Sequence, residues 1–192
     1  SMFNGDTNLS HVDLSGIDTS HVTNMNFMFA STQSLADLDL SGLDTSSLQR
    51  AEDMFYNATG LRNVNLSGWN LRNLSQASAM FFGAKNLANV NLSGWQLPDN
   101  ANTAGMFSYA DGENIKNVDI TNAKNITQDI LNEYVKGLKN TNATSVDLSN
   151  FSLAPTVRSL RGLFQNMPNL KSVNLRGFDT SHITDMSSMF SN

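Results

Sequence analysis

One recurring column of polar residues offers the best-placed surface chemistry in this chain. Segments of the type Val-Asp-Leu-Ser-Gly recur seven times, and each carries Asp or Asn at its second position. Carboxylate and amide groups in such a row suit sugar hydroxyls, peptide amides or hard cations such as Ca²⁺. We predict that the column forms a ligand-binding face, made of Asp13, Asp39, Asn65, Asn91, Asp119, Asp147 and Asn174. The alternative is a solvated face whose amides bond only one another.

Charge repulsion within this column favours a cationic ligand. Asp13 and Asp39 fall in consecutive segments, as do Asp119 and Asp147. Like charges on neighbouring strands repel unless a cation or a cationic partner neutralises them. We nevertheless assign no metal site and no cofactor from the sequence.

The chain lacks the residue sets that enzymes use. Its histidines are His11, His21 and His182, and the last two share a repeat position near opposite ends of the chain. There is no Ser/His/Asp set, glycine-rich phosphate loop or HExxH metal pair. Cysteine is absent, which excludes disulfides and thiolate metal sites. We therefore predict that the protein is not an enzyme.

The spacing of these segments identifies the architecture that positions them. They begin at Val12, Leu38, Val64, Val90, Val118, Val146 and Val173. The step between them is nearly constant, and a Met-Phe or Leu-Phe pair recurs in the same phase. A fixed period of this length is typical of a solenoid. We expect one domain over residues 1–192, a fragment of a longer protein, because neither end resembles a capping repeat.

Each repeat predicts one strand followed by one short helix. Leu38 and Leu40 alternate with Asp39 at the strand period, so the leucines should point inward. The apolar residues that follow, at i, i+3, i+6 and i+7, suggest a helix on the opposite face: Leu48, Ala51, Met54 and Phe55. The fold class is therefore an α/β solenoid, a right-handed array like leucine-rich repeats. It should have about seven repeats, each of roughly 26 to roughly 28 residues, with a parallel sheet on one face and short helices on the other.

The fourth and fifth repeats depart from the pattern. Residues 111–113 are an insertion, and Thr127 precedes a true amphipathic helix that Gly137-Leu138 should end. Trp69 and Trp95 stand on consecutive repeats, where they could stack on sugars. Their column is otherwise apolar, so burial is the favoured interpretation.

The charge and hydrophobicity of the chain argue against nucleic acid and membranes as binding partners. The net charge is −5 and only 15% of residues are charged, which gives no basic excess for nucleic acid. No apolar run approaches the roughly 20 residues that span a bilayer, so we expect no membrane insertion by this chain.

The repeat resembles a known family. Its pattern is L-x-x-[LV]-[DN]-L-S-G-Φ-D-T-S-x-V-T-x-M-x-x-M-F, and one copy is complete in Leu9, Val12, Asp13, Leu14, Ser15, Gly16, Ile17, Asp18, Thr19, Ser20, Val22, Thr23, Met25, Met28 and Phe29. This is similar to the 26-residue repeat of bacterial surface proteins known as a mycoplasma and lactic-acid-bacterial domain of unknown function, related to BspA-like leucine-rich repeats. The resemblance implies an exported protein, lipid-anchored or wall-anchored, that acts in adhesion. It supplies no catalytic residues.

The sequence therefore predicts a non-catalytic binding module on the bacterial cell surface. Its partner would be a host or bacterial surface protein or a glycan. The alternative is a structural stalk that holds another domain away from the cell wall. Because both ends expose an unpaired parallel strand, we also expect end-to-end self-association.

Overall fold

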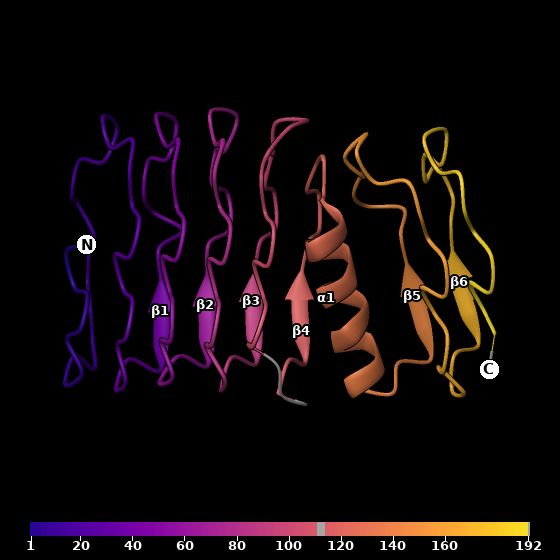
Figure 1. Ribbon diagram of the computed structural model, residues 1–192, viewed down its shortest axis with the longest axis horizontal. Coiled ribbons are helices and arrows are strands. Elements are labelled where there is room, and N and C mark those ends of the chain that lie inside the picture. Colours follow the sequence, from indigo (N-terminus) through magenta and orange to yellow (C-terminus); the bar gives the residue numbers. More distant parts are fainter. Residues whose placement is uncertain (111–113, 192) are drawn as a thin grey trace.

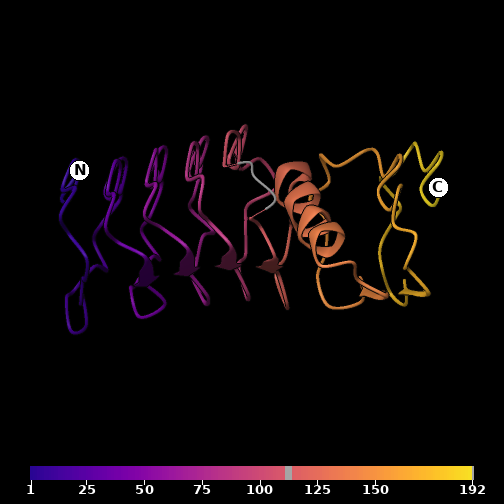
Figure 2. The same cartoon turned by 90° about the horizontal axis from the view of Figure 1, so that it is seen from below.

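The chain forms a parallel β-solenoid with little helix. The computed structural model describes residues 1–110 and 114–191, and its two termini lie at opposite ends of a row of stacked coils (Figure 1). The short strands of successive coils follow one side of this row (Figure 2). The predicted insertion at residues 111–113 lies outside the described residues.

Four of the strands form one continuous sheet. They are β1 (Asp37–Asp39), β2 (Asn63–Asn65), β3 (Asn89–Asn91) and β4 (Asn117–Asp119), paired in parallel in that order. Each strand has a buried apolar residue between two polar ones, so the alternation read from the sequence is confirmed. Equivalent residues pair with one another, as Leu38 does with Val64. Every polar column of the repeat therefore runs straight along the sheet.

A second parallel ladder lies on the far side of the core. Asn24, Arg50, Gln76 and Asn102 are joined by single bridges from coil to coil, and the first three are each followed by a buried apolar residue. In the residues that follow each bridge, every second backbone N–H donates to a carbonyl of the next coil. Met25 donates to the Arg50 carbonyl at 2.9 Å and Phe29 donates to the Met54 carbonyl at 2.9 Å.

The prediction of a short helix in every repeat is wrong. Residues 46–55 form turns and a bridge, because their N–H groups bond to the neighbouring coil and cannot make i→i−4 helical bonds. The backbone is also left-handed in successive coils, at Phe27 (φ 56°), Asp53 (φ 53°) and Ala79 (φ 53°). A left-handed residue interrupts a right-handed helix, so the apolar spacing reflects stacked turns.

The core is a column of identical side chains stacked between coils. Phe3, Phe29, Phe55, Phe81 and Phe107 stack with centroids 5.0–5.7 Å apart. Met54, Met80 and Met106 are fully buried beside them, so the predicted inward position of the Met-Phe pair is confirmed there. Burial of such rings and methionines is the main stabilising contribution, because each coil covers the apolar face of the next.

Within the described residues, one α-helix interrupts the sheet. Helix α1 (Gln128–Asn140) lies between β4 and β5 (Figure 1), and β5 (Ser145–Asp147) pairs only with β6 (Ser172–Asn174). Thr127 occupies the N-cap position as predicted, although its hydroxyl pairs with Thr103 Oγ1 at 2.7 Å. Gly137 does not end the helix. It lies inside it, where a Cβ atom would come within 3.1 Å of the Lys116 carbonyl oxygen.

The strand count also differs from expectation. Six strands are formed in the described part of the chain, because residues 12–14 of the first coil have no strand pairing. Ile17 and Met2 of the first coil are exposed.

Candidate binding site: a polar groove on the sheet face

A groove of about 820 Å³ runs along the outer face of the first sheet. It extends from the first coil across β1, β2, β3 and β4, and it includes five residues of the predicted column: Asp13, Asp39, Asn65, Asn91 and Asp119. The other two, Asp147 and Asn174, lie on β5 and β6 in the second sheet. The structure therefore brings together most of the predicted face and separates its last two members.

Every member of the column also builds a turn. The Oδ1 atom of Asp39 accepts the Ser41 N–H at 2.9 Å, and that of Asn65 accepts the Ser67 N–H at 3.1 Å. The same bond recurs at Asp13, Asn91, Asp119, Asp147 and Asn174. These are Asx turns, and they explain why the column accepts only Asp or Asn. Sequence reasoning missed this role, although Asx followed two residues later by Ser or Thr in most copies was its visible signal.

A second polar column lies beside the first and forms a ladder of amides. Asn63 Nδ2 donates to Asp37 Oδ1 at 2.5 Å, and Asn89 Nδ2 donates to Asn63 Oδ1 at 2.6 Å. In both bonds the acceptor lies in the preceding coil, nearer the N-terminus. Hydrogen bonds between neighbouring strands therefore hold the side chains of this second column in place. These side chains remain exposed to a ligand.

The groove carries negative charge. Hydrogen bonds from Ser15, first from its backbone N–H, lower the pKa of Asp13, and the Ser41 hydroxyl lowers the pKa of Asp39. Both carboxyls are therefore ionised at neutral pH. Among the described residues that line the groove there are four aspartates, one histidine and no Lys or Arg.

The charge is concentrated at the two ends of the groove. Asp13, Asp37 and Asp39 lie at the N-terminal end and Asp119 lies on β4, whereas β2 and β3 contribute amides alone. Acidic zones thus flank a neutral centre.

Tyr134 of α1 experiences the charges of both Asp119 and Asp147. Burial, with smaller effects from these two carboxylates, raises the pKa of Tyr134 to about 12. Its hydroxyl is therefore neutral, and it donates to the Asp147 carbonyl oxygen at 3.4 Å. Asp119 on β4 and Asp147 on β5 lie on strands that do not pair with each other. The repulsion predicted for these two residues on adjacent strands therefore does not arise.

The two tryptophans are not a sugar-stacking platform. Trp69 and Trp95 are buried and stack with centroids 6.3 Å apart. Each indole N–H donates inward, to the Leu40 and Leu66 carbonyls respectively. The prediction that both tryptophans are buried is confirmed.

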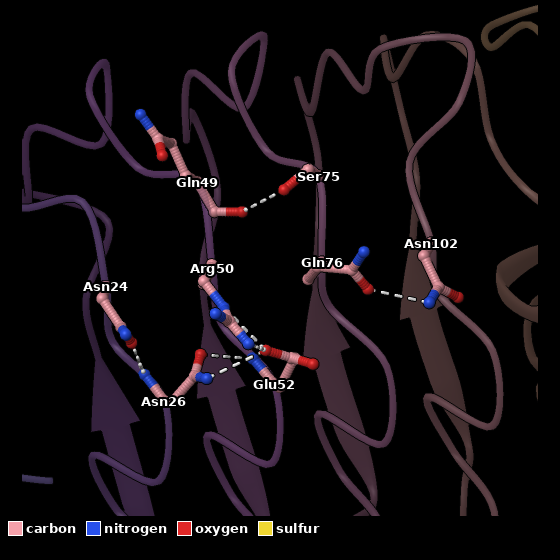
Figure 3. A network of polar contacts seen from close by, with 8 residues as sticks. All are labelled: Asn24, Asn26, Gln49, Arg50, Glu52, Ser75, Gln76 and Asn102. Carbon is pink, nitrogen blue, oxygen red and sulfur yellow. Dashed lines mark hydrogen bonds and ion pairs between the residues drawn. The ribbon is translucent and has the colours of Figure 1, made fainter.

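The opposite ladder is a weaker candidate because its charges are already paired. Arg50 lies 2.6 Å from Glu52 Oε2, which also accepts Asn26 Nδ2 at 2.9 Å (Figure 3). Asn102 Nδ2 donates to Gln76 Oε1 at 2.8 Å. Arg50 and Glu52 neutralise each other, whereas the described lining of the groove has aspartates and no Lys or Arg.

The described residues contain neither a metal-binding cluster nor a membrane span. Across residues 1–110 and 114–191, no three His, Asp or Glu side chains converge as a metal site. In this part of the chain no helix is long and apolar enough to cross a bilayer.

Stacked coils of near-constant length, closed by one ladder on each side of a shared core, define a repeat protein of the parallel solenoid class. The chain belongs to the family described as mycoplasma protein of unknown function, DUF285, whose model matches residues 1–122, 64–151 and 131–192. No curated protein and no solved structure matches the chain.

Proposed function

We propose that the protein is a non-catalytic binding module on a bacterial cell surface, where it adheres to a host or bacterial surface protein or to a glycan. The groove along β1–β4 carries this proposal, since it offers a continuous row of exposed and half-buried carboxylates and amides over an ordered backbone. Binding surfaces of solenoids are extended in this way because each repeat adds one rung to the same face.

The alternative is a stalk that presents another domain away from the cell wall. The uniform stacking of the phenylalanine column supports it, because a continuous core makes a stiff rod. The distribution of charge favours the binding module, since a stalk does not need acidic zones at two ends of one groove.

The finer description of the array is part of the same proposal. It comprises about seven repeats of near-constant length with a right-handed course, related to leucine-rich repeats. The regular steps of the sequence support this description. Apolar side chains exposed near both ends, including Ile17 and Phe190, support end-to-end self-association. Sedimentation that gives a strict monomer at high concentration would contradict such association.

The first test of the binding proposal is an array of matrix proteins, surface proteins and glycans, probed with the wild-type chain and two variants. Asn89→Arg places a long side chain in the middle of the groove while leaving the Asn91 turn intact. Gln76→Arg is the matched control on the opposite ladder, where Arg50 already occupies the same column.

Binding that is lost in Asn89→Arg and kept in Gln76→Arg supports the groove as the site. Equal loss in both variants, or a blank array with wild-type protein, moves the assignment to the stalk. Both variants add one positive charge, so the comparison is independent of net charge.

A further inference from the structure

The chemistry of the groove narrows the partner. None of the described lining residues is Phe, Tyr or Trp, so the groove offers no ring face for a sugar to stack upon. The polar lining is mainly carboxylate and amide. Such a surface complements basic side chains and the amide groups of an extended peptide.

The spacing of the two acidic zones sets a length for the partner. Asp39, Asn65, Asn91 and Asp119 are aligned residue to residue across β1–β4. Parallel strands lie about 4.8 Å apart, so three steps separate Asp39 from Asp119 by about 14 Å. An extended peptide advances about 3.4 Å per residue, so about four residues cover that distance.

The side-chain period of an extended peptide agrees with this length. Residues four apart in an extended chain point to the same side, whereas adjacent residues point to opposite sides. Two basic residues four apart can therefore enter both acidic zones together. Between them, the exposed amides of Asn63 and Asn89 face the middle of the bound segment.

From these observations we propose that the groove binds an extended protein segment with two basic side chains four residues apart, one beside Asp39 and one beside Asp119. The segment lies across the strands, along the line of the rungs. This inference rests on the proposed binding function and names the class of partner for the same groove.

The repeat itself supplies isosteric variants for a test. Asp39→Asn and Asp119→Asn remove one charge each, and Asn is the native residue of this column at Asn65 and Asn91. An Asn oxygen can still accept the turn N–H, so the fold is retained. Asp147→Asn is the matched control, because Asp147 makes the same turn on the second sheet, outside the groove.

The probes are fluorescent Ser/Thr-rich peptides, measured by fluorescence anisotropy at low and physiological salt. One carries two lysines four residues apart, a second carries the lysines side by side, and a third carries glutamates at the spaced positions. Only the spaced lysine peptide should bind well. Asp39→Asn and Asp119→Asn should each weaken its binding about two- to fivefold, as expected for one exposed ion pair, and Asp147→Asn should leave it unchanged.

Two results overturn the inference. One is equal binding of the spaced and adjacent lysine peptides, and the other is an equal loss in Asp147→Asn, since either means attraction by net charge alone. The proposed function fails separately. If Asn89→Arg abolishes binding of a glycan on the array while no lysine peptide binds, the groove is a binding site and the cationic segment is the wrong partner.

Discussion

The first sheet and the region after it use the same repeat and build different surfaces. From β1 to β4 the strands pair without interruption, and the opposite ladder runs beside them as far as Asn102, so one groove spans them all. After β4 the strand pairing stops and a second sheet of β5 and β6 begins. The length of the groove is therefore set by where the strand ladder is interrupted.

Helix α1 interrupts one side of the coil and leaves another side continuous. Asn122 N–H still donates to the Asn150 carbonyl at 2.7 Å, and Ile126 still bridges to Leu153 across the same step. Helix α1 packs against β4 through Gly137, close to Lys116. The solenoid thus stays connected while its strand face opens, and the helix marks the end of the groove.

The largest expected effect concerns the phenylalanine column of the first region. Phe81 is fully buried between Phe55 and Phe107, so Phe81→Ala should lower the free energy of unfolding by about 3 to 5 kcal/mol. Urea unfolding followed by far-UV circular dichroism measures this. Phe190→Ala is the control, because Phe190 is 52% exposed and should change little. Equal losses of unfolding free energy in the two variants would mean that burial does not determine how much each phenylalanine stabilises the protein.

The next effect concerns the contact that ends the groove. Gly137→Val places a branched side chain against the Lys116 backbone, where even a Cβ atom would lie 3.1 Å from the carbonyl oxygen. We expect a loss of about 1–3 kcal/mol from overpacking. Asn132→Val is the matched control, since Asn132 is exposed on the same helix. If both variants lose the same free energy, the close contact between Gly137 and Lys116 does not cause the loss.

Local patterns in the sequence were sufficient for part of this fold. The alternation around Leu38 predicted the strands, and the amphipathic pattern after Thr127 predicted α1, whose apolar residues Ile130, Leu131 and Val135 are buried. Both patterns depend only on which side chains face the core, which the sequence records directly.

The predictions that failed depended on partners far along the chain. The helices expected near Met54 do not form, because the N–H groups there bond to the neighbouring coil, a whole repeat further along the sequence, and no local pattern reveals that. Gly137 looked like a helix stop, yet its role is a close approach to Lys116. The predicted column is divided between two sheets because α1 packs against β4 where the next strand would otherwise pair.

A smaller effect tests the turn that both regions share. Asn65→Ala removes the acceptor for the Ser67 N–H and should cost about 0.5–1.5 kcal/mol. Asn65→Asp keeps the acceptor, as Asp39 does in the same column, and should cost less. Thermal melts of the two variants at neutral pH separate these outcomes. Equal destabilisation would show that the Asx turn does not determine the residue at this position.

The smallest effect is a dependence of stability on acid. The Ser41 hydroxyl lowers the pKa of Asp39 below its ordinary value of 3.8, and the Ser149 hydroxyl lowers the pKa of Asp147 in the same way. A carboxyl whose pKa is lowered by folding stabilises the protein above the unfolded pKa, and this contribution is lost as the pH falls through the folded pKa. Asp39→Asn and Asp147→Asn should therefore each reduce the loss of stability below about pH 4, which urea titrations at a series of acidic pH values measure. Because each turn is local to its coil, the two variants should behave alike although they lie on different sheets. A pH response confined to Asp39→Asn would mean that the continuous sheet, and not the turn, controls ionisation in this column.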